Sequence, residues 1–517
     1  MSMIAVVGFW LDQNATLRHG LLALRKMLGA HTGDNQGSLV WGVITEYKIE
    51  KILGYFTLDN ASNNVTALDY IGVQINSSYE IQLNNPVFNT QSRFNRCYGH
   101  ILNLVVKVFL YGKKSSRLAN NRVEKDSIEQ ENREVEEWRK VGPLGKLRNI
   151  TVWIQRSPQR RAAFAELVEK MMAGSGKQAR QLILGNVTRW TGDYDALSRA
   201  LEFRQAIDLH FQMLIMDDPK ITISNDRITS DDWSVLQTIS GILEPFREET
   251  LALEGNKAQG SLYEVYPSLQ ALTNHLAQTK SNLALQHSPL QRSLYLAIEK
   301  FNKYYSLETL SPILCAAIIL NPNMDNFFAS ESGWGGRPDW VSHAKYLVRQ
   351  LWITNYKSLS LHQQKISTPD SPRRNQNPAA MGPPKSVRSF KKPKVSPRID
   401  MDEMDHYLRW CEHNEDELEN PIQWWISKKP TYPKLSIFAL DTFSVPAMAA
   451  ECERVFSSAK HQITDCRNRL SEDIIESGEC QKSWARSSLI AFKVADEMSK
   501  TLEKAEQDAL VLETISN

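Results

Sequence analysis

Apolar positions in the first 112 residues follow two different repeats. Alternating or nearly continuous apolar runs predict strands, over residues 3–11, 17–27, 52–59 and the beginning of 93–112. Apolar residues at helical spacing predict helices, over 35–49, 60–75 and the remainder of 93–112. The run at 52–59 is apolar almost throughout, as expected for a strand that is covered on both faces. This order of elements predicts an α/β unit.

Helical spacing dominates the chain from 145 to 356 and predicts a large all-α region. Leu197 and Ala200 illustrate this spacing. Residues 402–484 are again helical in pattern and rich in aromatic side chains. Charge dominates residues 113–140, between the α/β unit and the all-α region, and predicts a solvated helix or a flexible connector.

Residues 366–400 differ in composition from the rest of the chain. They contain seven prolines and eight basic residues against two acidic ones. Such a segment cannot bury enough apolar surface to fold, which predicts a disordered linker. Its cluster SFKKPKVSPR is typical both of a nuclear import signal and of a plain basic linker. We expect the protein to be located in the nucleus. The predicted divisions are 1–112, 113–365, 366–400, 401–485 and a polar tail at 486–517.

Composition narrows the class of protein. A chain of 517 residues is long enough for more than one domain, and 42% hydrophobic residues can form a sizeable core. The net charge of +2 argues against a uniformly cationic protein, so a nucleic-acid surface must be a local patch. Six scattered cysteines without a CxxC pair suit a reducing compartment. No apolar stretch reaches the ~18 residues of a membrane span, so we expect a soluble intracellular protein.

The sequence GYFTLDNASNN, residues 54–64, ends an apolar run on Asp59. Polar side chains at the carboxyl ends of parallel strands point into the crevice of an α/β sheet, where a carboxylate can hold a hard cation such as Mg²⁺. The alternative is that Asp59 or Asn60 caps the helix that follows. Spacing alone favours the cap and leaves the metal site open.

Two glutamates flank the apolar stripe of the helix predicted after Pro446. At about 100° per residue, Glu451 and Glu453 lie on opposite borders of the stripe, about 200° apart. At most one of them can serve a given site, and periodicity does not choose between them. Two solvated glutamates are the alternative. The predicted stripe contains Cys452, Val455, Phe456, Ala459 and Ile463.

Two further groups of residues are candidates for binding. Cys97 and His100 lie one helical turn apart, which is half of a zinc site or a packed core pair. Basic residues in two segments can line a phosphate-binding groove or form ordinary surface charge. These residues are Lys146, Arg148, Arg156, Arg160, Arg161, Arg467 and Arg469.

Eight segments, in this order, resemble the hAT superfamily of DNA transposases, the hobo/Activator group, in its fungal form. They are GAHTGDN, GYFTLDNASNN, RFNRCYGHILNL, WRKVGPLGKL, VTRWTGDYDALSRALEFR, LNPNM, FSVPAMAAECERVFSSAKHQIT and RNRLSEDIIESGECQKSW. The resemblance covers about residues 3–485. No single segment is decisive, but their common order makes the resemblance specific.

The resemblance implies a ribonuclease H-like core that a helical insertion interrupts and a C-terminal dimerisation segment completes. It also implies metal-dependent cleavage and joining of DNA at terminal inverted repeats. The second family aspartate falls on Asp59 and the family glutamate on Glu453, as ligands of Mg²⁺ or Mn²⁺. Cys97 and His100 match a pair near that site. Trp190 lies in the insertion segment VTRW, where an aromatic ring can stack on an unpaired base; a tryptophan of the core is the alternative, which we favour. The implied partners are transposon-end DNA and a second copy, without a membrane or a small-molecule substrate.

The sequence departs from the family pattern at its start. The first family aspartate belongs to a strand before residues 4–12, and neither that strand nor the BED zinc finger is found; Asp12 falls in a turn-like DQN. We therefore expect an incomplete core with two unpaired strand edges, in a protein that is mostly α overall. Two-metal strand transfer is then expected to be impaired in this chain alone. The alternatives are an enzyme completed by another chain, a domesticated non-catalytic DNA-binding protein, and a helical scaffold that only dimerises.

Overall fold

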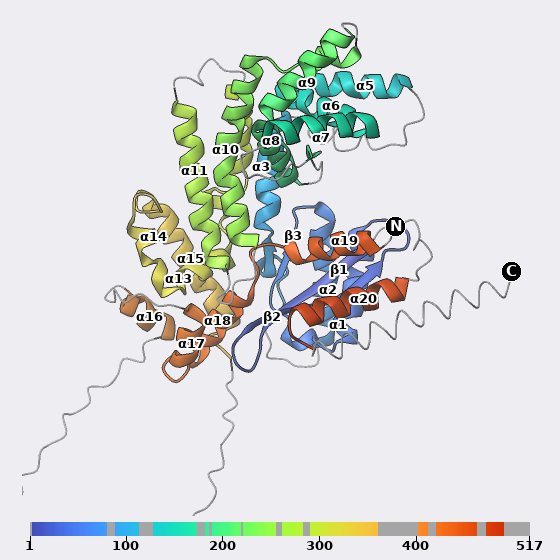
Figure 1. Cartoon of the computed structure of the whole chain (residues 1–517). Coiled ribbons are helices and arrows are strands. Elements are labelled where there is room, and N and C mark those ends of the chain that lie inside the picture. The colour runs from blue at the N-terminus through green and yellow to red at the C-terminus, as the bar shows by residue number, and fades with distance from the viewer. Residues whose placement is uncertain are drawn as a thin grey trace, which may run out of the picture.

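The computed structural model is mostly helical, with a small α/β part below a tall helical body (Figure 1). None of the described helices is long and apolar enough to cross a membrane. The predicted linker at 366–400 and most of the predicted tail lie outside the described residues. The structure describes residues 3–79, 88–112, 128–172, 181–185, 189–218, 221–254, 261–282, 290–359, 402–411, 420–462 and 472–490.

The chain begins with a β-hairpin. Strands β1 (Met3–Leu11) and β2 (Leu17–Lys26) coincide with the two strands that the apolar runs predict, and they pair antiparallel. Asp12 organises the turn, because its carboxylate accepts the backbone N–H of Thr16 at 2.9 Å and the side chain of Arg18 at 2.9 Å. Asp12 therefore lies in a turn, as its sequence context predicts.

A second, separate pair of strands follows. Strands β3 (Phe56–Leu58) and β4 (Phe94–Arg96) pair in parallel, and helices α1 (Gly33–Glu46) and α2 (Ser62–Tyr79) pack beside them. β3 is shorter than predicted, because the run begins with the 3₁₀ turn at Glu50–Ile52. Among the described strands β1 pairs only with β2, and β3 only with β4, so the α/β part does not contain one continuous sheet.

The helical body starts from the second strand pair and extends away from it. Its first helix, α3 (Tyr98–Tyr111), leaves the end of β4 and runs up into the body (Figure 1). This long helical stretch agrees with the predicted all-α region. The other helices of the body are α5 (Ile128–Arg139), α6 (Pro143–Gln155), α7 (Pro158–Met172), α8 (Trp190–Glu202), α9 (Arg204–Asp217), α10 (Ser230–Glu254), α11 (Val265–Ser281), α12 (Leu290–Asn302), α13 (Pro312–Ile319), α14 (Asp325–Ala329) and α15 (Pro338–Asn355).

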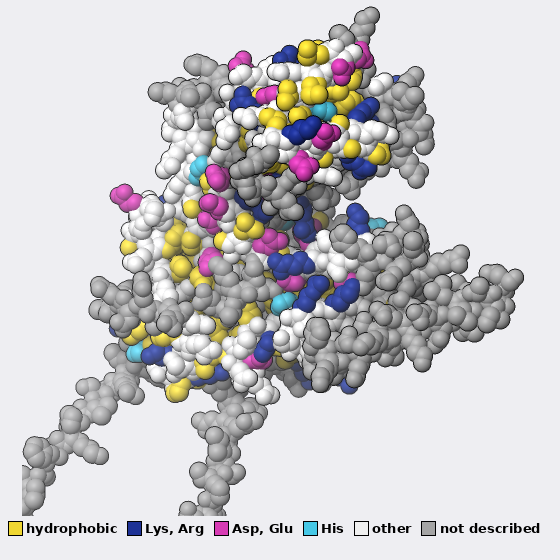
Figure 2. Space-filling model, in the orientation of Figure 1, with side chains coloured by type: hydrophobic (Ala, Val, Ile, Leu, Met, Phe, Trp, Pro, Cys, Tyr) yellow, Lys and Arg dark blue, Asp and Glu magenta, His cyan; other side chains and the backbone are white. Residues whose placement is uncertain are grey.

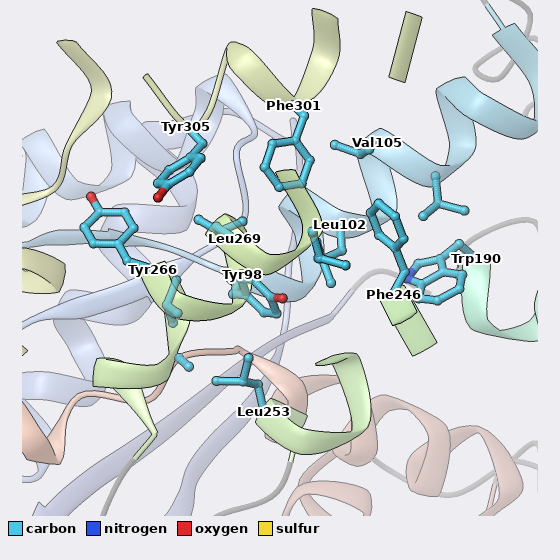
Figure 3. Packing of buried hydrophobic residues seen from close by; sticks show 14 of the residues in the cluster. Tyr98, Leu102, Val105, Trp190, Phe246, Leu253, Tyr266, Leu269, Phe301 and Tyr305 are labelled. Carbon is cyan, nitrogen blue, oxygen red and sulfur yellow. The ribbon is translucent and has the colours of Figure 1, made fainter. Parts of the chain in front are cut away.

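One large hydrophobic cluster fills the helical body. Side chains from α3, α8, α10, α11 and α12 converge in it, and Figure 3 shows Leu102, Trp190, Phe246 and Leu269 among them. All four are almost fully buried. Burial of this much apolar surface is the main stabilising contribution in such a core.

The C-terminal helices divide between the two parts of the molecule. Side chains of α16 (Glu403–Cys411), α17 (Pro421–Lys428) and α18 (Pro433–Ser444) join the large cluster of the helical body. Helices α19 (Ala450–Gln462) and α20 (Glu472–Arg486) pack instead on the β1–β2 hairpin. The turn between α18 and α19 therefore connects the helical body to the α/β part.

Candidate nucleic-acid site where β3 meets α19

Asp59 follows the last residue of β3, at the start of the turn that leads to α2. Its Oδ1 accepts the backbone N–H of Ala61 at 2.9 Å and the side-chain amide of Asn64 at 2.6 Å. α2 begins three residues after Asp59, so one carboxylate oxygen stabilises the entry to this helix, much as the cap alternative predicts. The same bonds fix the carboxylate at the end of the strand.

The turn before α19 is clamped to the second strand pair. Thr57 and Asn95, which face each other across β3 and β4, both donate to the carbonyl oxygen of Pro446, at 3.0 and 3.2 Å. The backbone N–H of Tyr98 donates to the carbonyl of Ala447 at 3.1 Å. These bonds hold the first turn of α19 next to the end of β3.

Sequence reasoning missed this clamp. The available signal is Asn95, a polar residue within a predicted strand, which is fully buried in the structure. A buried amide needs hydrogen-bond partners, and here the acceptors of the Asn95 side-chain N–H groups are far away in sequence. Asn95 therefore contributes to the site by positioning a distant turn.

The two glutamates of α19 face different neighbours, as their spacing predicts. Glu451 forms an ion pair with Arg454 and lies 3.8 Å from the imidazole of His19 on β2. Glu453 instead forms an ion pair with Arg189, which precedes α8. The structure therefore places Glu453, and not Glu451, on the side that faces the helical body.

Glu453 also interacts electrostatically with Asp59. Partial burial raises the pKa of Glu453, the nearby carboxylates of Glu254 and Asp59 raise it further, and Arg189 opposes these effects. The side chain keeps 52% of its surface exposed, so solvent weakens these interactions. The structure thus brings together the two carboxylates that the resemblance assigns to one site.

Cys97 and His100 lie at the start of α3 beside these carboxylates. The Cys97 sulfur accepts the backbone N–H of Ala449 at 3.3 Å, and burial raises the pKa of its thiol. Burial lowers the pKa of His100, Asp59 opposes this shift, and Lys300 lowers the pKa further. A protonated thiol that is hydrogen-bonded to the α19 turn agrees with a packed pair better than with half of a zinc site.

The side chains around Asp59 and Glu453 do not form a ready-made metal centre. Asp59 uses one oxygen at the helix entry, and the charge of Glu453 is compensated by Arg189. Within the part of the chain that the structure describes, no three His, Cys, Asp or Glu side chains are arranged to share a metal ion. The described residues therefore show no three-ligand metal centre, and Mg²⁺ or Mn²⁺ stays a prediction from the resemblance.

Trp190 is placed differently from the base-stacking position that the resemblance suggests. Its side chain is only 2% exposed and packs edge-on against Tyr194 and Phe246 in the helical core (Figure 3). Its backbone N–H donates to the side chain of Asn103 at 3.0 Å. A base cannot reach this ring without opening the core, so the assignment of Trp190 to nucleic-acid binding is corrected.

The predicted phosphate-binding residues of α6 and α7 do not form one free cationic patch. Lys146 pairs with Asp232 at 2.7 Å, and Arg148 pairs with Glu134 at 3.0 Å while its guanidinium lies 4.1 Å from the Trp138 ring centroid.

Arg160 covers the ring of Trp153 at 3.8 Å and donates to its carbonyl, whereas Arg156 and Arg161 are exposed. Arg467 and Arg469 lie outside the described residues. α6 and α7 are in the upper part of the helical body, away from β3 and α19 (Figure 1). The basic residues singled out in this segment therefore do not gather around Asp59.

Positive side chains do occur beside the carboxylates. Figure 2 shows Lys and Arg interspersed with Asp and Glu where the helical body meets the α/β part. Arg189 and Arg454 are among the charged residues at this junction, and the Arg454 guanidinium also donates to the carbonyl of Glu254 at 3.2 Å.

The predicted apolar stripe of α19 is correct for Val455 and Ala459, whereas Phe456 is 40% exposed. Only part of the stripe therefore faces the hairpin.

Three family profiles match separate parts of the chain. The ZBED1 RNase-like domain matches residues 1–87, and the ZBED1 RNase-like helical domain matches residues 95–242. The hAT family C-terminal dimerisation region matches residues 403–485. The first two matches contain Asp59 and Arg189, and the third contains Glu453.

Similar proteins come from fungi and plants. "Putative transcriptional regulator tpeD" of Talaromyces stipitatus is 26% identical over 89% of this chain and 49% of its own length. "Putative AC transposase" of Zea mays is 21% identical over 94% of this chain and 55% of its own length. "Zinc finger BED domain-containing protein RICESLEEPER 2" of Oryza sativa is 20% identical over 94% of this chain and 63% of its own length. The chain thus spans about half to two thirds of these relatives, and with the three profiles they show that it belongs to the hAT transposase-like family.

Proposed function

We propose that this protein binds DNA at the junction that holds Asp59 and Glu453, self-associates through its C-terminal region, and does not cut or join DNA by itself. One observation carries the proposal. Asp59 acts electrostatically on Glu453, and Arg189 forms an ion pair with the Glu453 carboxylate. This arrangement supports a retained DNA-binding scaffold with impaired strand transfer.

The names of the relatives support contact with DNA. One relative is named as a transposase and another as a transcriptional regulator, and both roles require DNA. A DNA-binding role also places the protein in the nucleus, in agreement with the basic segment 366–400. The match of residues 403–485 to a dimerisation region supports self-association with a second copy.

Two other functions make different predictions. A complete metal-dependent transposase would cleave or join terminal-repeat DNA when Mg²⁺ or Mn²⁺ is added. A helical scaffold would self-associate without binding DNA. The relative named as a transcriptional regulator favours a third function, a DNA-binding protein without any catalytic role. Such a protein would not transfer DNA strands even when another chain completes the site, and only in this respect does it differ from the proposal.

Binding of the purified chain to a fluorescent mixed-sequence duplex tests the proposal. Anisotropy should show binding that weakens steeply as salt rises, because neutralising phosphates releases counterions. Light scattering after size-exclusion chromatography should show a dimer or a larger oligomer. An intact dimer without DNA binding at low salt would leave only the scaffold, and cleaved or joined DNA in Mn²⁺ would contradict the impairment.

A further inference from the structure

Two cations on different elements lie near the neighbours of Asp59, one beside Asn60 and the other near His100. Arg96, at the end of β4, donates from Nη1 to the side-chain oxygen of Asn60 at 3.2 Å. Lys300, near the end of α12, lies close enough to His100 to act on the same imidazole as Asp59. β4 belongs to the α/β part and α12 to the helical body, so the two cations come from opposite sides of the junction.

Tyr304 lies close to both cations. The Lys300 ammonium lies 5.7 Å from the centroid of the Tyr304 ring. Burial raises the pKa of the Tyr304 hydroxyl, and Arg96 is near enough to oppose this shift. The hydroxyl therefore stays neutral and is a hydrogen-bond donor near neutral pH. The guanidinium of Arg96 is in turn held over the Phe94 ring, at 5.7 Å.

The charges of Arg96 and Lys300 are not compensated by ion pairs. Neither cation has an Asp or Glu oxygen within 4.0 Å among the residues that the structure describes, and the Arg96 side chain is exposed. Arg189, Lys146 and Arg148 differ, because each of them has a carboxylate partner. Two cations that lack an ion-pair partner and lie near the same tyrosine are suited to an anionic ligand, because charge-assisted hydrogen bonds to phosphate are strong.

We propose that Arg96, Lys300 and Tyr304 bind a phosphodiester group of a DNA strand that runs past Asp59. This inference rests on the proposed function and assigns to it the residues that contact the backbone. Arg and Lys are the usual partners of DNA phosphates, and such contacts fix the position of the strand without reading its sequence. None of the three residues belongs to the motifs that the sequence singles out for nucleic-acid binding.

Salt-dependent DNA binding tests the assignment. The double variant R96Q/K300Q is compared with R292Q/K345Q, which removes the same charge from two exposed cations on α12 and α15. Anisotropy with the mixed-sequence duplex is measured over a range of salt concentrations. The slope of log affinity against log salt should fall by about 2 in R96Q/K300Q and stay unchanged in the control.

Two additional variants separate charge from structure. R96K/K300R keeps both charges and should retain the wild-type slope, while Y304F should weaken binding without changing the slope. Circular dichroism melting confirms that each variant is folded. Equal slopes in the wild type and R96Q/K300Q would overturn this site but leave DNA binding intact. Absence of DNA binding in the wild type would overturn the proposed function and this site together. If the wild type instead bound a polyglutamate peptide, and R96Q/K300Q lost that binding, the site would belong to an acidic protein partner and the phosphodiester assignment would be overturned.

Discussion

The helical body and the α/β part differ in how their hydrophobic cores are organised. A single cluster runs through the helical body and includes side chains of α17 and α18 from the C-terminal region. The α/β part has two small clusters, one between the hairpin and α19–α20, the other between β3, β4, α1 and α2. No described strand connects the two pairs. The helical body therefore has one continuous core, against which Leu11, Ala15 and Tyr55 of the α/β part pack, whereas the α/β part divides its own core in two.

This difference explains why the candidate site lies at the junction. Asp59 comes from one small cluster, and Glu453 comes from the helix that covers the other. The Pro446 carbonyl, bound by Thr57 and Asn95, sets the distance between them. Arg189 from the helical body then pairs with Glu453. All parts of the molecule thus contribute to one small surface.

The largest predicted effect is in the continuous core. Phe246→Ala removes a fully buried ring that packs on Trp190, and should lower the free energy of unfolding by about 3–5 kcal/mol. Urea denaturation followed by circular dichroism measures the change. Tyr295→Ala, on an exposed side chain of α12, is the control and should cost less than about 1 kcal/mol. Similar losses in the two variants would contradict a single close-packed body.

A substitution in a small core should act locally. Leu24→Ala removes a buried side chain of β2 that belongs to the same cluster as Val455 and Ile475. It should lower the free energy of unfolding by about 2–4 kcal/mol. Hydrogen exchange should speed up in β1, β2, α19 and α20 while α10 remains protected. Leu28→Ala, at an exposed position, is the matched control. Equal acceleration in α10 would show that the two parts unfold together.

The half-buried carboxyl of Asp441, at the edge of the helical body, should make the stability of the protein depend on pH. Burial raises the pKa of Asp441 to about 6, although its carboxylate accepts the hydroxyl of Tyr356 at 3.1 Å. Between about pH 4 and 6 the folded state holds a proton that the unfolded state has lost, so stability falls as pH rises through this window. Asp441→Asn should stabilise the protein by about 2–3 kcal/mol above pH 6, and by almost nothing below pH 4.

Thermal melts from pH 4 to 8 measure this effect. Asp339→Asn, at an exposed position on α15, is the control and should change stability by less than about 1 kcal/mol. If Asp441→Asn were less stable than the wild type at pH 7, the ionised Asp441 carboxylate would stabilise the fold. Folding would then lower the pKa of Asp441, contrary to the direction given above.

The smallest effect is expected at the ion pair that joins the two parts. Arg189 and Glu453 are 37% and 52% exposed, so Arg189→Gln should change stability by less than about 1 kcal/mol. The pKa of Glu453 should nevertheless rise, because a charge that lowers it is lost. Carbon-detected NMR titration measures this pKa. Lys170→Gln, which breaks an exposed pair within α7, should leave the pKa of Glu453 unchanged.

Much of the fold could be predicted from local pattern. The apolar runs gave the two hairpin strands, and helical spacing gave α1, α2 and the helical body. The resemblance assigns Asp59 and Glu453 to one site, a choice that periodicity alone left open. The strands and helices depend on residues that are near one another in sequence, and the resemblance depends on segments in a fixed order, so both can be found without knowing the fold.

Contacts between distant segments could not be predicted. Nothing near Thr57 or Asn95 indicates that both bind the carbonyl of Pro446, which is hundreds of residues away. The basic pattern around Arg148 does not reveal that Glu134 and Trp138 already occupy its guanidinium. Spacing likewise did not distinguish the buried Val455 from the exposed Phe456, because that depends on which part of α19 the hairpin covers.

We propose that the Asp59–Glu453 junction binds DNA without a metal centre. The affinity for the duplex, measured in Mg²⁺ and in EDTA at equal ionic strength for the wild type and Asp59→Asn, tests this proposal directly. We predict that the wild type binds equally well in both solutions and that Asp59→Asn binds more tightly, because it removes a negative charge beside the phosphates. If the wild type bound the duplex only in Mg²⁺ and Asp59→Asn did not bind it, DNA binding without a metal centre would be contradicted.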